Sequence, residues 1–223
     1  MKRNIKIVLT LVLALAMLAS LSGCGAVFTS ASANNSGGSG AGSNEAPDTY
    51  TPPALDEGLT YFADIEIEGY GLITIQLNPA VAPVTCANFV ELAESGFYDG
   101  LTFHRIMAGF MMQGGDPLGN GYGGSDNEIF GEFKKNGHEN NLSHVRGTVS
   151  MARSQAPNSA SSQFFICHAD SEFLDGQYAA FATVTEGIEV VDAVCEAAQP
   201  TDRNGTIPPE AQPVMTSVTI RTE

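Results

Sequence analysis

Short runs of alternating apolar and polar residues fill the chain from about residue 58 onward, and this alternation limits the fold more than any other feature. Residues 61–67 and 72–77 each place their isoleucines on a single face. A period of two is that of a half-buried β-strand. The turn residues 69–71 separate the two runs, so the pair predicts a hairpin. Further strands are expected over residues 102–107, 110–113, 148–152, 163–168, 179–184 and 215–221.

Helical spacing occurs in two segments of this region. In the first, Pro83 suits an opening helical turn and Gly96 suits a stop. The second covers residues 187–197. Many short strands with few helices favour closure of the sheet, because closure removes exposed strand edges. We therefore expect residues 58–223 to form a mostly β domain, a closed eight-stranded antiparallel β-barrel capped by two α-helices.

The N-terminal segment has the charge order of a secretory signal. Residues 1–6 are short and basic, and residues 7–18 are apolar but too short for an ordinary spanning helix. The sequence Leu-Ser-Gly-Cys ending at Cys24 resembles the lipobox of bacterial lipoproteins. That resemblance implies a signal peptide over 1–23 and lipidation of Cys24, and hence an exported protein anchored to the outer face of the cell membrane. The alternative is an ordinary signal peptide with an incidental cysteine.

Residues 24–57 are rich in Ser, Gly, Asn and Pro and show no hydrophobic periodicity. This composition is typical of a flexible linker. A formal net charge of −15 accompanies it, which repels nucleic acid and anionic headgroups, so no nucleic-acid partner is expected. The simplest interpretation of the acids is that they keep an exported protein soluble.

Three cysteines remain beyond Cys24, namely Cys86, Cys167 and Cys195. Their odd number and the lack of a Cys-x-x-Cys pair suggest neither a disulfide framework nor a zinc site. We expect buried free thiols and neither a metal nor a cofactor. The glycines at 114–115 and 119–124 lack a following Gly-Lys-Ser/Thr, so they indicate turns rather than a phosphate-binding loop.

Residues 103–116, 150–166 and 173–181 carry three long and unusual motifs. They read FHRIMAGFMMQGGD, SMARSQAPNSASSQFFI and FLDGQYAAF, and all three resemble the signature segments of cyclophilins. With a similar first helix, the resemblance spans residues 60–221. It implies an eight-stranded barrel with an external proline-binding groove and peptidyl-prolyl cis-trans isomerase activity (EC 5.2.1.8).

The resemblance also implies site residues. Arg105 corresponds to the family's catalytic arginine and Gln113 to the polar residue beside it. Phe173 replaces a tryptophan on which cyclosporin binding depends in the family, so we expect that binding to be weak. Tyr178 stands where many members have histidine. The full set of implied substrate-binding residues is Phe110, Met111, Gln113, Ala152, Gln163, Phe165, Leu174 and Tyr178.

An arginine suits this chemistry. Rotation about an X–Pro bond breaks amide resonance and leaves lone-pair density on the prolyl nitrogen. A donor directed at that nitrogen favours the twisted state over either planar one. A guanidinium is a planar, permanently charged donor and not a proton-transfer base. Alternation places His104 on the opposite strand face from Arg105, so a structural, hydrogen-bonding role is expected for this histidine.

Two functions are compatible with these residues. The first is an isomerase that accelerates folding of exported proteins, with proline-containing peptides and unfolded exported chains as partners and a monomeric state. The second is a chaperone or scaffold module that binds proline-containing segments with little turnover. A serine or cysteine hydrolase has little support, because no serine lies in a Gly-x-Ser-x-Gly context and Cys86 falls in a predicted helix.

Overall fold

The computed structural model describes residues 49–223. The predicted signal peptide, Cys24 and most of the predicted linker lie outside these residues. Every predicted strand and helix is present, with shifts of a few residues at the boundaries. In chain order the elements are β1 Tyr61–Ile67, β2 Gly71–Leu77, α1 Pro83–Glu94, β3 Thr102–Met107, β4 Met111–Asp116, β5 Thr148–Met151, β6 Phe164–Cys167, β7 Ala180–Glu186, α2 Ile188–Ala197 and β8 Met215–Thr222.

The eight strands form one antiparallel sheet in the order β3-β4-β6-β5-β7-β2-β1-β8. β3 and β8 are therefore its two edges, and the sheet is a half-barrel rather than the closed barrel that the sequence predicted. The two edges approach each other only through an isolated bridge between Thr102 and Val214 and backbone bonds such as Phe103 N–H to Pro213 O. The chain before β8 thus covers the β3 edge with loop backbone, which satisfies its polar groups without completing the ladder.

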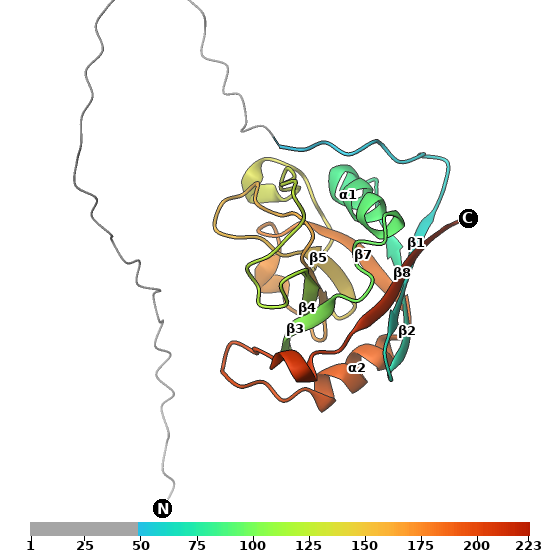
Figure 1. Cartoon of the computed structure of the whole chain (residues 1–223). Coiled ribbons are helices and arrows are strands. Elements are labelled where there is room, and N and C mark those ends of the chain that lie inside the picture. Colours follow the sequence, from blue (N-terminus) through green and yellow to red (C-terminus); the bar gives the residue numbers. More distant parts are fainter. Residues whose placement is uncertain (1–48) are drawn as a thin grey trace, which may run out of the picture. The chain divides into compact units, whose positions relative to one another are not determined.

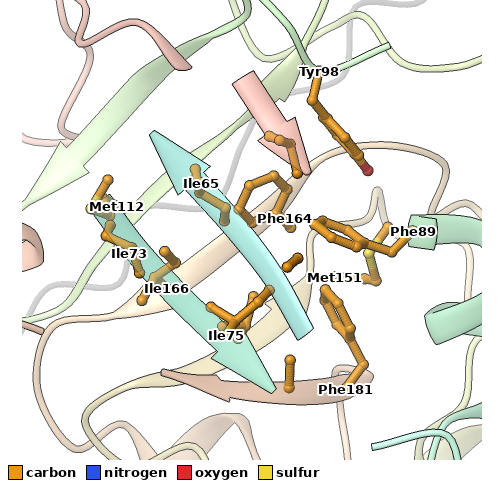
Figure 2. Close-up of a cluster of buried hydrophobic side chains, with 14 of the residues drawn as sticks. Ile65, Ile73, Ile75, Phe89, Tyr98, Met112, Met151, Phe164, Ile166 and Phe181 are labelled. Carbon is orange, nitrogen blue, oxygen red and sulfur yellow. The ribbon is translucent and has the colours of Figure 1, made fainter. Parts of the chain in front are cut away.

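Aromatic rings fill the space between the sheet and α1 (Figure 2). Phe89 of α1 packs against the rings of Tyr98, Phe164 and Phe181 at centroid distances of 5.1 to 5.5 Å. All four side chains are fully buried, as are the inward isoleucines of β1 and β2. The period-two pattern therefore reports this core correctly.

The N-terminus of helix α1 is capped by a residue that is distant in the sequence. Its N-cap residue Ala82 offers no side-chain acceptor, and the first-turn N–H groups of Val84 and Thr85 instead donate to the carboxylate of Glu132 at 3.0 and 2.8 Å. The Thr85 hydroxyl donates to the same carboxylate at 2.7 Å. Glu132 is almost fully buried, so this anion is placed at the positive end of the helix dipole. α1 and α2 lie at opposite ends of the curved sheet (Figure 1).

Two details differ from the sequence analysis. Gly114 and Gly115 were expected in a turn, but they continue β4. A side chain at Gly114 would place its Cβ 2.7 Å from Thr102 O, and Gly115 has φ +80°, so only glycine allows the strand to pass here.

In addition, Tyr50 and Leu55 of the predicted linker pack against the domain: Tyr50 bridges to Ile129, and its hydroxyl donates to the Glu91 carboxylate.

Candidate active site

The outer face of the sheet carries a row of side chains across four strands. Pairing places Arg105 of β3 opposite Gln113 of β4, Gln113 opposite Phe165 of β6, and Phe165 opposite Ser150 of β5. Neighbouring residues on each strand point to the other face, where Ile106, Met112 and Ile166 join the main core. Strand register alone therefore brings together three of the predicted site residues, although they are up to 60 positions apart in the chain.

Beside this row lies a cluster of apolar side chains that is separate from the main core and is called the socket below. Its buried members are Met111, Phe165, Cys167 and Leu174. The half-buried side chains of Met107, Phe110, Ala152 and Tyr178 pack against them. Four of the predicted substrate-binding residues, Phe110, Met111, Phe165 and Leu174, thus lie in one cluster. Met107 and Cys167 also belong to it, and the period-two alternation from Arg105 and Phe165 could have indicated both of them.

The Arg105 guanidinium is held at the edge of this socket. Its Nη1 donates to Gln113 Oε1 at 3.1 Å, its Nη2 lies 3.4 Å from Met107 Sδ, and its Nε donates to the Asn204 carbonyl at 2.7 Å. The side chain is half-buried, and burial lowers its pKa from the ordinary value of 12.5. A guanidinium remains charged at neutral pH despite such burial, so the site has a fixed cationic donor next to a cluster of apolar side chains.

Asn204 belongs to a turn that Asp202 organises. The Asp202 carboxylate accepts the N–H groups of Asn204 and Thr206 at 2.9 and 3.1 Å and the Thr206 hydroxyl at 2.8 Å. The sequence pattern does not indicate that this turn belongs to the site, because only the packing of residues 201–207 against β3 brings the turn to Arg105. Backbone bonds such as Ile106 N–H to Gly205 O fix that packing.

A chain of amides continues from Arg105 along the outer face. Gln113 Nε2 donates to Gln163 Oε1 at 2.8 Å, and Gln163 Nε2 donates to the Gly123 carbonyl at 2.7 Å. The Gln163 carbonyl also accepts the Ala152 N–H at 2.9 Å. These residues line a polar groove of about 680 Å³ that Arg153, Tyr122 and the backbone of residues 121–128 help to enclose. A peptide lying across the site would meet hydrogen-bonding groups here and the apolar socket beside them.

Tyr178, Phe173 and Arg153 lie around the socket. The Tyr178 ring packs edge-on against Phe165, with centroids 6.0 Å apart. Phe173 is 66% exposed and packs against Phe110 at 5.6 Å. The Arg153 guanidinium stands over the Tyr178 ring at 4.8 Å and donates to the Gln177 carbonyl, so it is engaged in holding this edge together.

His104 does not have the expected hydrogen-bonding role. It is buried, and among residues 49–223 neither ring nitrogen has a hydrogen-bond partner. The register shifts between Phe103 and Arg105, which inserts a β-bulge at this position. The bulge lets both Phe103 and Ile106 enter the core, although strict alternation would separate their faces. Burial lowers the pKa of His104, which disfavours the charged form of the ring.

A buried polar group beneath the socket also escaped sequence analysis. His144 Nδ1 donates to Asp175 Oδ1 at 2.8 Å, and its Nε2 accepts from the Ser150 hydroxyl at 3.0 Å. The imidazole stacks on Phe165 with centroids 6.0 Å apart. Both His144 and Ser150 are fully buried, so this arrangement supports the socket and offers no exposed nucleophile.

Within the described residues, no group of three or more His, Cys, Asp or Glu side chains is placed to hold a metal ion. Nor does this part of the chain contain a helix that is long and apolar enough to span a membrane. Cys86, Cys167 and Cys195 are buried and unpaired, which confirms the predicted free thiols. The site presents one fixed cationic donor, two glutamine amides and the apolar socket.

A half-barrel with such a site on its outer face is suited to binding a peptide. Comparison with known proteins supplies the family. Residues 62–220 match the family model of the cyclophilin type peptidyl-prolyl cis-trans isomerases, and the chain belongs to this family. It is accordingly a peptidyl-prolyl cis-trans isomerase (EC 5.2.1.8).

The relatives are close over most of the domain. A peptidyl-prolyl cis-trans isomerase-like 1 protein of Rhizopus delemar is 48% identical over 122 residues, which cover 54% of this chain and 72% of that protein. A peptidyl-prolyl cis-trans isomerase of Helicobacter pylori is 42% identical over 126 residues, covering 56% and 75%. A cyclophilin of Cryptosporidium parvum, crystallised with the dipeptide Ala-Pro, is 30% identical with a TM-score of 0.63, covering 73% and 99%.

Proposed function

We propose that this enzyme accelerates the folding of exported proteins, with Arg105 stabilising the twisted X–Pro amide. The observation that carries the proposal is the position of the Arg105 guanidinium. Three contacts hold it at the edge of the apolar socket formed around Met111 and Phe165. A proline ring in that socket would bring its nitrogen toward a fixed cationic donor.

The mechanism needs only binding and electrostatics. The socket holds the proline ring by burial, at roughly 25 cal/mol per Å² of apolar surface. The acyl side of the bond then rotates while the ring stays fixed. At the twisted geometry the nitrogen becomes a hydrogen-bond acceptor, and a donor already in place stabilises this state more than either planar one. Gln113 orients Arg105 or binds the substrate carbonyl, while Ala152 and Gln163 contact the substrate backbone.

The proposed partners follow from the same site. They are proline-containing peptides and unfolded exported proteins, and the Ala-Pro dipeptide of the Cryptosporidium relative fits a site of this kind. Phe173 leads us to expect weak cyclosporin binding, because phenylalanine lacks the indole N–H of tryptophan. We expect the protein to act as a monomer without a cofactor.

The cellular location rests on the N-terminal sequence. We propose that residues 1–23 are a lipoprotein signal peptide and that Cys24 becomes lipidated. Residues 24–57 would then link the isomerase domain at 58–223 to the outer face of a bacterial cell membrane. Acyl chains anchor a protein at about 0.8 kcal/mol per buried CH₂. Replacing Cys24 with alanine should move the protein from the membrane fraction to the soluble fraction, and unchanged membrane association would contradict lipid anchoring.

The central test is Arg105→Ala in a peptide isomerisation assay. Loss of one preorganised donor typically lowers kcat by about 10² to 10³. Arg221→Ala is a matched control, because Arg221 pairs with Asp64 at a distant edge of the sheet. Equal rates for Arg105→Ala and the wild type would discard the mechanism. Aggregation suppression should be measured in parallel: if suppression persists without turnover, the same groove also serves the alternative function of a proline-binding chaperone.

A further inference from the structure

The turn between β3 and β4 carries one wall of the socket. It runs from Met107 to Phe110 and is closed by a bond from Phe110 N–H to Met107 O. Gly109 has φ +79°, as the third position of a type II turn requires. In such a turn the N–H of the third residue makes no bond within the turn. It is therefore free to donate to a group outside the turn.

His168 supplies that partner. The residue follows β6 directly, and its Nδ1 lies 2.8 Å from the Gly109 nitrogen. A backbone N–H can only donate, so Nδ1 is the unprotonated acceptor and the ring proton is on Nε2. The main-chain N–H of His168 also donates to Phe110 O at 2.9 Å. One residue thus holds the turn by its backbone and its side chain together.

The second ring nitrogen is held as firmly as the first. His168 Nε2 lies 3.1 Å from Asp192 Oδ1 of α2. Both Asp192 oxygens accept from the Arg146 guanidinium, the longer bond being 2.7 Å. Arg146 also donates to the His168 carbonyl at 3.1 Å. The ring is therefore fixed in one tautomer and one orientation by groups from three separate segments.

We propose that His168 is a positioning residue of the isomerase, which holds the β3–β4 turn so that Phe110 and Met107 keep their places at the socket and beside Arg105. The Asp192–Arg146 pair sets the tautomer that makes this possible. The inference rests on the proposed function in one respect, namely that Phe110 forms a wall of the proline-binding socket.

The test compares two substitutions in the purified full-length protein. His168→Leu removes the acceptor and should raise KM about fivefold at pH 7.5 while kcat stays within about twofold, since a loosened wall weakens ground-state and transition-state binding alike. His168→Asn keeps an acceptor near the position of Nδ1 and should restore a low KM. Thermal melts of each variant check that the fold is intact.

Two controls separate the alternatives. His138 is half-buried, and its Nε2 lies 2.8 Å from the backbone carbonyl of Val81, outside the socket; His138→Asn should leave KM unchanged. Phe110→Ala tests the socket itself. If Phe110→Ala leaves KM unchanged, the socket assignment fails and the inference fails with it. If Phe110→Ala raises KM but His168→Leu does not, or if His168→Asn raises KM as much as His168→Leu, the role of His168 is refuted while the proposed function stands.

Discussion

Substitution of Glu132 by glutamine tests the distant cap of α1. The carboxylate accepts three hydrogen bonds, from Val84 N–H, Thr85 N–H and the Thr85 hydroxyl. A glutamine amide with its oxygen toward Thr85 keeps two of them, but its NH₂ group then faces the Val84 N–H donor. The substitution therefore loses one charge-assisted bond, weakens the other two and removes the anion from the N-terminus of the helix.

The size of the effect follows from these losses. One hydrogen bond to a charged group is worth about 1.5 to 3 kcal/mol, and the interaction with the helix dipole adds about 1 kcal/mol in a partly buried setting. Glutamine is easier to desolvate than a carboxylate, which offsets part of the loss. We expect the free energy of unfolding to fall by about 3 kcal/mol. For a domain of this size that corresponds to a decrease in Tm of about 6 to 12 °C.

Urea unfolding followed by far-UV circular dichroism measures this free energy directly. Glu94→Gln is the matched control, because Glu94 is exposed at the opposite end of the same helix. Neutralising an acid there should change stability by about 0.5 kcal/mol or less, in the stabilising direction. A loss below about 1 kcal/mol for Glu132→Gln at pH 7 would refute the capping argument.

Three further predictions concern the site and its surroundings. Asp202→Ala should release the turn that presents the Asn204 carbonyl to Arg105. We expect kcat/KM to fall about tenfold with little change in the urea midpoint, and an unchanged kcat/KM would show that the turn has no part in catalysis. Burial lowers the pKa of His144 in the folded protein, so below the usual histidine pKa of 6.5 the unfolded chain binds the proton more readily than the folded one. The free energy of unfolding should therefore fall as the pH drops below 6.5, and equal urea midpoints at about pH 7 and pH 5 would contradict this. Burial raises the pKa of Cys167 and of Cys195 to about 12, so native protein should react with a thiol reagent only after unfolding, and rapid reaction of either thiol would show that it is exposed.

The sequence predicted the local elements well, since periodicity reports which face of a strand or helix is buried. It also predicted the socket, because its members lie in motifs that are shared with the family. It failed where glycine or a bulge changes the pattern. Gly114 and Gly115 resemble a turn, yet they extend β4 because other backbone passes too close for a side chain. The bulge at His104 interrupts the alternation, so that Phe103 and Ile106 both face the core.

The amino-acid sequence by itself determined the strands, both helices and the outward position of Arg105. These features depend on neighbours within a few positions, which a periodic pattern records. The residues that surround the socket followed instead from motifs shared with the family. Only the tertiary structure decided that the sheet stays open between β3 and β8, that Glu132 caps a helix 47 residues away, and that Asn204 and His168 hold the two sides of the site. These contacts join residues far apart in the chain, and their partners are backbone carbonyls and N–H groups, which every residue carries and which therefore leave no mark in the sequence.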